Sequence, residues 1–332
     1  MTPAFDDYVQ IISTLFDEFV QTEPVELNYQ NLNTYSNLSI IIFFMMMQMR
    51  QITTFKAQHR WLKAVPERSQ SLGWETVPDR TTLSRRYKKL GAVVSAFVAF
   101  VGTAVTELGD PFSNTELVED KSLFKAKGPV WHQSDRHAGR VSKGLRHLDK
   151  DATWSKSDYH GWVYGYGLHL TSSAHTFPKL VQIETASVPE STVIDNKAEA
   201  IMSQLQPERL TADDGYSKAS RIRDWAEQGV CLITPALRWV VGQAAENYHR
   251  FLEEDDIRAS LQGRKTSIEP LFDLIAKMIG AIDNHKQLKV QQMANVRTCL
   301  ALGTFSVQIA MIVNSIWGRP LRNISHIMAV FA

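Results

Sequence analysis

Cysteine is scarce in this chain, since only Cys231 and Cys299 are cysteines among its 332 residues. Two cysteines cannot form the disulfide framework of a small secreted domain, and they cannot supply a cysteine zinc site. The acidic start of the chain also lacks the basic segment and apolar run of a signal peptide. These absences indicate a cytoplasmic protein.

Several motifs of nucleotide-binding and hydrolytic enzymes are missing as well. Gly161, Gly165 and Gly167 have the wrong spacing for a dinucleotide-binding turn, and residues 263–266 lack the upstream glycine of a P-loop. No G-x-S-x-G or H-E-x-x-H sequence is present. His132 and His137, five positions apart, fit a metal site, but surface or phosphate contacts are the commoner role for such a pair.

Long apolar runs are few, and two of them invite comparison with membrane helices. Residues 40–47 are apolar throughout, but a span needs roughly 20 residues. Residues 298–318 carry no charge, yet Thr304, Gln308 and Asn314 would be costly against lipid. We therefore expect a buried helix at 298–318 and no membrane partner.

Positive charge is absent from residues 1–49, which hold six acidic residues and no lysine or arginine. The net charge of +1 by itself argues against a nucleic-acid partner, but it hides an uneven distribution of charge. Residues 50–90 carry a net +7 and residues 121–160 a net +5. Clustered positive charge is typical of phosphate-backbone binding, although two solvated basic faces would give the same count.

The length favours two domains of about 100–200 residues each. The first 108 residues predict helices, because apolar residues recur there at helical spacing. The predicted helices are 5–20, 38–49, 53–65, 79–90 and 91–108. The segments 53–65 and 79–90 have helix-turn-helix character, and the hydroxyl residues and arginines of the second suit base-edge and phosphate contacts. An exposed amphipathic helix is the alternative.

From residue 115 the pattern changes to strands that later alternate with helices, which favours an α/β sheet with an N-terminal meander. The predicted strands are 115–125, 162–172, 179–186, 209–213 and 230–235. Helices are expected at 195–205, at 219–228 and throughout the chain after residue 244. Residues 129–159 predict a long basic loop with aromatic residues.

Acidic residues at the ends of strands are the strongest candidates for chemistry. Asp120 and Asp213 each end a predicted strand, and Glu269 opens a helix after a basic stretch. Three carboxylates that converge at a sheet edge would need cations, and Mg²⁺ prefers such oxygen ligands. Two such ions support phosphodiester chemistry. The spacing alone is weak evidence, because the chain has 35 acidic residues.

Four strings carry a resemblance to a known family. They are VEDKSLFKAKGPVWH (118–132), DATWSKSDYHGWVYGYGLHL (151–170), LTADDGYSK (210–218) and RKTSIEPLF (264–272). With FKAQHRWL (55–62) and VPDRTTLSRRY (77–87), they make the chain resemble bacterial insertion-sequence transposases of the DDE class. The resemblance covers roughly residues 50–315, and the A-D-x-G-Y element is its most specific part.

The resemblance implies an RNase H-like fold, a five-stranded mixed sheet flanked by helices, with Asp120, Asp213 and Glu269 as catalytic metal ligands. The first aspartate would contact two Mg²⁺ ions, or Mn²⁺ ions in their place, and each of the other acids would hold one ion. Asp214 is the less suitable neighbour, because the family's acid precedes x-Gly-Tyr. The implied chemistry is hydrolytic nicking at the element's ends and attack of the freed 3′-hydroxyl on target DNA.

The expected DNA contacts lie in the second helix of the helix-turn-helix pair, in the 129–160 loop and around Glu269. They are Arg80, Arg85, Arg86, Lys88, Lys127, Trp131, His132, Arg136, Arg140, Lys143, Arg264, Lys265 and Lys277. One family branch has Y-x2-R-x3-E-x6-K around its glutamate. Here those positions are Gln262, Lys265 and Ala276, so only a basic residue at the arginine position is kept, and the route of end processing, hairpin or other, stays open.

We expect a helical DNA-binding domain at 1–112, an RNase H-like catalytic domain at 113–285 and helices that pack on it at 286–332. The implied partners are double-stranded DNA, both terminal repeats and target, and a second copy of the chain, since two ends must be paired. Two alternatives remain open. One is a catalytically inactive or domesticated DNA-binding regulator, and the other is a related nuclease without strand transfer.

Overall fold

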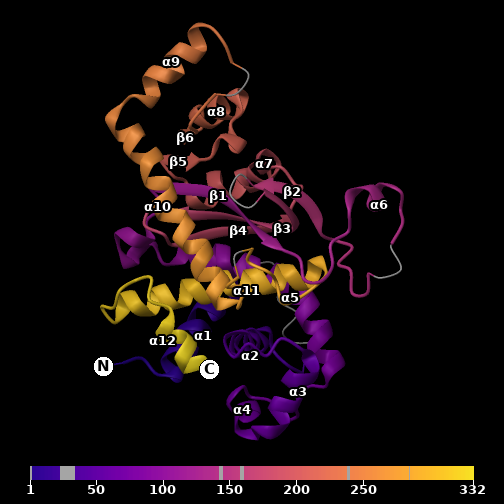
Figure 1. The fold of residues 1–332 in the computed structure, drawn as a ribbon. Coiled ribbons are helices and arrows are strands. Elements are labelled where there is room, and N and C mark those ends of the chain that lie inside the picture. The colour runs from indigo at the N-terminus through magenta and orange to yellow at the C-terminus, as the bar shows by residue number, and fades with distance from the viewer. Residues whose placement is uncertain (1, 23–33, 142–144, 158–160, 238–239, 284) are drawn as a thin grey trace.

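The computed structural model describes every residue except 1, 23–33, 142–144, 158–160, 238–239 and 284 (Figure 1). A mixed sheet lies at the centre of the molecule. Helices α5 and α11 pack against one side of the sheet, and α7 and α8 lie on the other (Figure 1). Helix α10 runs past β1 and β5 towards α11 (Figure 1).

The N-terminal region is helical, as its periodicity predicts. Its helices are α1 (Phe5–Thr22), α2 (Asn37–Met49), α3 (Phe55–Ala64), α4 (Pro66–Ser71) and α5 (Arg80–Ala104). Asp79 caps α5, since its side chain accepts a hydrogen bond from the Thr82 amide at 2.8 Å. The prediction of separate helices at 79–90 and 91–108 is wrong, because α5 continues through Gly91. That glycine lets α11 approach closely, as a Cβ there would lie 3.1 Å from the Arg297 Cβ.

The sheet has six strands, in the order β2-β3-β1-β5-β6, with β4 also paired to β3. They are β1 (Glu116–Lys125), β2 (Thr153–Ser157), β3 (Gly161–Ser173), β4 (Pro178–Thr185), β5 (Arg209–Ala212) and β6 (Cys231–Ile233). Strand β3 pairs antiparallel with β1, β2 and β4, whereas β5 pairs parallel with β1 and β6. This mixed sheet flanked by helices confirms the RNase H-like fold.

The extra strand comes from the segment that was expected to be one long loop. Residues 129–159 contain the short helix α6 (Gln133–His137) and strand β2. Strand β2 pairs with the first residues of β3, from Thr153↔Gly165 to Ser157↔Gly161. The five strands expected from the family are therefore all present, and β2 is an addition at the start of β3.

The remaining elements are helical. They are α7 (Glu190–Ala200), α8 (Ala219–Ala226), α9 (Gln243–Leu252), α10 (Asp255–Met278), α11 (Met293–Ile316) and α12 (Ser325–Phe331). A π-helical turn, Ile201–Leu205, extends α7, and short 3-10 turns lie at Thr106–Leu108, Asp110–Phe112 and Asp214–Tyr216. Helices dominate after residue 244 as expected, but the expectation of helix throughout is wrong between α10 and α11, where the described residues of 281–292 form turns and irregular backbone.

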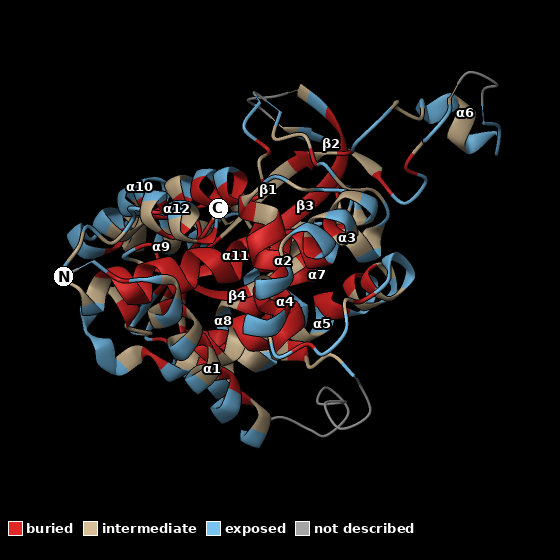
Figure 2. Cartoon of the chain, turned by 90° about the horizontal axis from the view of Figure 1, so that it is seen from below, coloured by how far each residue is buried: buried red, intermediate tan, exposed pale blue. Residues whose placement is uncertain are grey.

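One large hydrophobic core joins all three regions of the chain. It includes residues of the N-terminal helices, of β1 and β3, and of α10 to α12. A smaller core lies between the sheet, α7 and α8. The burial colours show this continuous interior through α2 and α11 (Figure 2). The domain limits at residues 112 and 285 remain predictions, because packing alone does not divide the chain there.

Two helices, α5 and α11, are long and apolar enough to cross a membrane by length and composition. The apolar window of α11 is 89% buried inside the molecule, as in the core helix of a soluble protein. Its Gln308 side chain donates hydrogen bonds to the carbonyls of Val98 and Pro178, both at 3.0 Å. The expectation of a buried helix at 298–318 agrees with this packing.

Candidate active site

Two of the expected acidic residues lie side by side at the centre of the sheet. Strands β1 and β5 are parallel neighbours whose register ends at Glu119↔Ala212. Asp120 and Asp213 are the next residues along each strand, so the two carboxylates stand at the same level. The guanidinium of Arg264 on α10 lies within 4 Å of both carboxylates, so the two side chains lie close together.

Asp120 is held in place by two hydrogen bonds. Its Oδ1 accepts one from the Lys121 amide at 2.8 Å, and its Oδ2 accepts one from Arg264 Nη1 at 3.0 Å. Burial raises the pKa of Asp120 to about 6, although the Arg264 guanidinium opposes part of that rise. The nearby Asp213 carboxylate raises this pKa further. Asp120 is therefore a largely buried anion whose charge depends on a neighbouring cation.

Asp213 begins the 3-10 turn that follows β5, and it is more open. Its side chain is 48% exposed and accepts a hydrogen bond from the Asp214 amide at 2.7 Å. Arg221 holds the turn in place, because its guanidinium donates hydrogen bonds to the carbonyls of Tyr216 and Ser191. The Ala-Asp-x-Gly-Tyr sequence thus places one carboxylate at the rim and packs the tyrosine inside.

Arg264, on α10, lies between the two aspartates. Its Nη1 is 3.0 Å from Asp120 Oδ2, and its Nη2 is 3.8 Å from Asp213 Oδ1. The side chain is only 8% exposed. The sequence predicts a DNA-phosphate contact for Arg264, but the structure directs its guanidinium to the carboxylates instead of to solvent. It neutralises the acidic pair.

Glu269 does not join the two aspartates. It lies five residues after Arg264 on the same helix, which corresponds to about 140° around the helix axis. The buried Ile268, Leu271 and Ile275 fix the orientation of α10 and leave Glu269 exposed. Within the described residues, no three Asp, Glu, His or Cys side chains gather as a metal-binding group. The structure therefore brings together two of the three expected acids.

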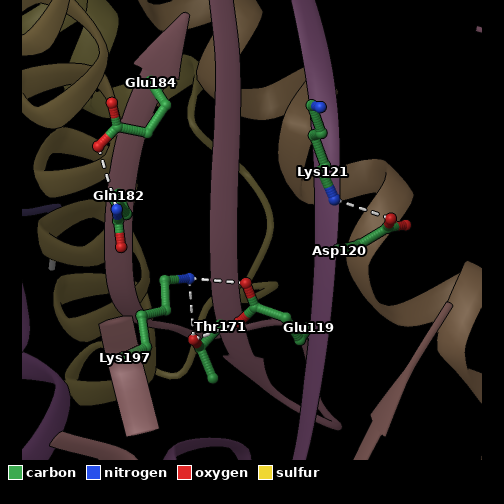
Figure 3. Close-up of polar contacts among 7 residues, drawn as sticks. All are labelled: Glu119, Asp120, Lys121, Thr171, Gln182, Glu184 and Lys197. Carbon is green, nitrogen blue, oxygen red and sulfur yellow. Dashed lines mark hydrogen bonds and ion pairs between the residues drawn. The ribbon is translucent and has the colours of Figure 1, made fainter. Parts of the chain in front are cut away.

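A second polar cluster lies on the other face of β1, which the sequence interpretation overlooked (Figure 3). Glu119 is fully buried, and its carboxylate binds Lys197 Nζ at 2.7 Å and the Thr171 hydroxyl at 2.5 Å. Next to it, Lys121 Nζ lies 3.2 Å from Glu190. The sequence contained a signal for this cluster, because side chains alternate along a strand. Glu119 and Lys121, the neighbours of Asp120, must therefore point to the opposite face.

The expected DNA contacts of α5 are mostly exposed. Arg80, Arg85 and Lys88 face solvent along the first half of the helix. Arg86 differs, since its Nη2 donates to the Tyr35 carbonyl at 3.1 Å and to Asn37 Oδ1 at 2.6 Å. Arg86 therefore ties α5 to the start of α2, which leaves the other three basic residues as the open face.

Several expected contacts in the segment around α6 hold that segment together. Trp131 donates to the Arg140 carbonyl at 2.9 Å, and Arg136 donates to the Ala152 carbonyl at 2.6 Å while lying over the Trp131 ring. His132 and Arg140 are exposed. Lys143 lies outside the described residues. His132 and His137 belong to no metal-binding group among the side chains that the structure describes.

The three remaining lysines of the expected set are exposed. Lys127 donates to the Lys289 carbonyl at 2.8 Å, so it also links β1 to the segment before α11. Lys265 and Lys277 face solvent on α10, near Glu269 in sequence. These exposed positions are open to a phosphate backbone.

The donor chemistry of the Asp120–Asp213 pair fits a divalent cation. Mg²⁺ is usually bound through one or two carboxylates and keeps several waters, and both aspartates offer oxygen ligands at one sheet edge. The pair fits one ion where Arg264 now provides the positive charge. The ligands for a second ion are not assembled, because Glu269 lies apart.

Residues 116–271 match the family model of the transposase DDE domain. A comparison with curated proteins finds no match. The matched region begins with β1 and ends within α10, so it includes Asp120, Asp213 and Glu269 as well as Arg264.

Proposed function

On the premise that the chain belongs to the DDE transposases of insertion sequences, through the transposase DDE domain at residues 116–271, we propose a function. The protein cuts DNA at the ends of its element and joins the freed 3′-hydroxyls to target DNA. The observation that carries this proposal is the position of Asp120 and Asp213 at the same level of neighbouring parallel strands. Both reactions are in-line phosphoryl transfers on DNA.

Asp120 and Asp213 are the proposed ligands of Mg²⁺, or of Mn²⁺ in its place. When bound, the metal supplies activation of a water or 3′-hydroxyl and stabilisation of the leaving oxygen. The protein contributes orientation, because backbone amides of Lys121 and Asp214 each fix one carboxylate oxygen. Arg264 faces the other oxygen of Asp120, Oδ2, and the amide-bound Oδ1 of Asp213.

Glu269 is the proposed third acid, on the strength of the family pattern. In this arrangement it needs a change in α10 to reach the pair, and Arg264 must at the same time leave the carboxylates. DNA phosphates offer Arg264 another anionic partner, which makes binding of the DNA end a suitable trigger. Lys265 and Lys277, both exposed on α10, are proposed to bind phosphates beside it.

DNA is proposed to bind over α5 and the α6 segment. One contact region consists of the exposed basic residues Arg80, Arg85 and Lys88. Another consists of Lys127, His132 and Arg140. Pairing of two DNA ends would require a dimer or a larger assembly. The proposed location is the bacterial cytoplasm, in association with the nucleoid.

A strand-nicking assay with Mg²⁺ tests the proposal. The substrate is a duplex with the terminal repeat found in the DNA that flanks the gene. Wild type should nick at the end of the repeat, and Asp213→Ala should not, because one metal ligand is lost. Equal nicking by both proteins would defeat the enzyme assignment.

A catalytically inactive DNA-binding regulator is the second candidate. Two observations favour it: Arg264 already neutralises the aspartates, and Glu269 is directed to solvent. Sequence-specific binding of the terminal repeat without Mg²⁺-dependent nicking would select this candidate. Nicking without joining of a labelled end to a plasmid would instead indicate a nuclease.

A further inference from the structure

An exposed tryptophan marks the start of β3. Trp162 is 65% exposed, and it is the only exposed tryptophan in the part of the chain that the structure describes. Tryptophan is enriched at interfaces, because its large ring offers apolar area beside a polar N–H group. Its cross-strand partner is Lys156 of β2, which is also exposed.

Trp162 and the candidate active site share one face of the sheet. Asp120 pairs directly with Leu170 of β3, so the two side chains point to the same side. Trp162 precedes Leu170 by an even number of residues, and alternation along the strand puts its ring on that side too. Eight residues of strand correspond to about 27 Å, or about 8 base pairs of DNA at roughly 3.4 Å each.

Trp154 joins the β2–β3 hairpin to the basic α6 segment through a hydrogen bond. Trp154 of β2 packs on Tyr164 with ring centroids 5.4 Å apart, and its indole donates to the Trp131 carbonyl at 2.9 Å. The α6 segment extends beyond the sheet on the side of β2 (Figures 1 and 2). Trp162 and Lys156 lie on the same hairpin as Trp154, which binds this segment.

Buried Asp149 holds the β2–β3 hairpin in position. It accepts hydrogen bonds from the Tyr166 hydroxyl at 2.8 Å and from the Gln292 amide at 3.0 Å. Its carbonyl accepts a third, from the Tyr164 hydroxyl at 2.6 Å. The same residue therefore connects β3 to the start of α11, and the hairpin does not depend on DNA for its position.

Building on the proposed transposase function, we propose that Trp162 and Lys156 form a second contact with the DNA end, about 8 base pairs from the cleaved bond. Lys156 binds a backbone phosphate, and the Trp162 ring packs against the nucleotide beside it. Duplex DNA fits this surface because an exposed aromatic ring and an exposed lysine stand opposite each other across the two strands.

The test measures binding of a fluorescent 40-base-pair duplex that carries the terminal repeat from the DNA flanking the gene. The variants are Trp162→Ala, Trp162→Phe and Lys156→Gln, and Ile282→Ala is the control at an exposed apolar residue elsewhere (78% exposed). Trp162→Ala should weaken binding about tenfold, as loss of one aromatic contact to a nucleotide does. Trp162→Phe should recover most of the affinity.

Lys156→Gln should lower the dependence of log affinity on log salt by about one unit, because one phosphate contact is lost. Hydroxyl-radical footprints should lose protection about 8 base pairs from the cleaved bond in Trp162→Ala and stay unchanged elsewhere. Melting temperatures should equal that of wild type, since both side chains are exposed.

Equal affinity and footprint for Trp162→Ala and Ile282→Ala would overturn the inference. If wild type still nicks the duplex with Mg²⁺ in that case, only this contact fails and the proposed function stands. A wild-type protein that neither binds nor nicks the duplex would overturn both.

Discussion

Arg264 is the residue on which the state of the candidate site depends. It provides the positive charge between Asp120 and Asp213, and without it two carboxylates would repel each other. Arg264→Met should therefore lower the free energy of unfolding by about 2 kcal/mol without metal. Mg²⁺ should then raise the melting temperature of the variant more than that of wild type, because no cation has to leave.

Lys265→Met is the matched control, since Lys265 is the next residue and is exposed. Its melting temperature and its response to Mg²⁺ should follow wild type. An identical Mg²⁺ response in Arg264→Met and wild type would contradict competition between Arg264 and the metal.

Lys179 gives the fold a distinct pH dependence. Its ammonium group is fully buried and donates to the carbonyls of Gly102 and Phe112, and burial lowers its pKa to about 7. Between pH 10.5 and 7 the unfolded chain binds a proton that the folded chain does not. The free energy of unfolding should thus fall as the pH decreases through this range. The fall should exceed that of Lys179→Met by an amount on the order of 4 kcal/mol.

Chemical denaturation at several pH values between 7 and 10 measures this effect. The two carbonyls that lose their donor in Lys179→Met lower its stability equally at every pH, so only the slope is diagnostic. Parallel curves for the two proteins would show that Lys179 keeps its proton when buried.

At this scale the sequence predicted the places of Asp120 and Asp213 in neighbouring strands, but it did not predict what surrounds them. Asp120 and Asp213 follow from strand ends and a short turn motif, which are local features. The roles of Arg264 and Glu269 depend on the rotation of α10, which is set by contacts of Ile268 and Leu271 with distant parts of the chain. No local pattern contains that information.

At the scale of elements, glycines decide how closely helices approach their neighbours. A Cβ at Gly102 of α5 would lie 2.5 Å from the Lys179 carbonyl oxygen of β4, whereas a Cβ at Gly263 of α10 would meet nothing within 4 Å. Gly102→Ala should destabilise the protein by about 3 kcal/mol through overpacking. Gly263→Ala should stabilise it by about 0.5–1 kcal/mol, because alanine favours the helix.

Denaturant unfolding of the two variants checks the pair. The same alanine substitution should give opposite signs at the two positions. Destabilisation of similar size in both would mean that the α5–β4 contact is looser than the structure indicates.

Most elements were predictable because apolar periodicity is local. The strands that became β1, β3, β4, β5 and β6 were all expected, close to their observed limits. The sequence suggested a break at Gly91 because glycine is a poor helix former, but the packing of α11 on that glycine stabilises the continuous helix. The sequence did not predict strand β2, because this strand stands at the end of a long basic segment that has the character of a loop.

At the scale of the whole molecule, the two ends of the chain meet. The Phe5 and Phe331 rings lie 5.0 Å apart, and the Tyr8 hydroxyl is 2.9 Å from His326 Nδ1. Phe97 of α5 contacts both Phe16 of α1 and Phe305 of α11. Calorimetry should therefore record one cooperative unfolding transition, and Phe97→Ala should lower its midpoint without splitting it.

Two well-separated transitions would contradict this expectation. They would instead support the division at residues 112 and 285 that the sequence suggested. Such long-range cohesion could not be predicted from local patterns, because it depends on which apolar faces meet after folding.

Transfer of a labelled terminal-repeat end into a plasmid, with Mg²⁺, tests the central claim most directly. The comparison is between Asp213→Asn and Asp214→Asn, adjacent residues of which only Asp213 is a proposed metal ligand. Wild type and Asp214→Asn should yield joined product, and Asp213→Asn should yield none above background while it still binds the DNA. Joining by Asp213→Asn at the wild-type rate would contradict the assignment of the Asp120–Asp213 pair as the catalytic site.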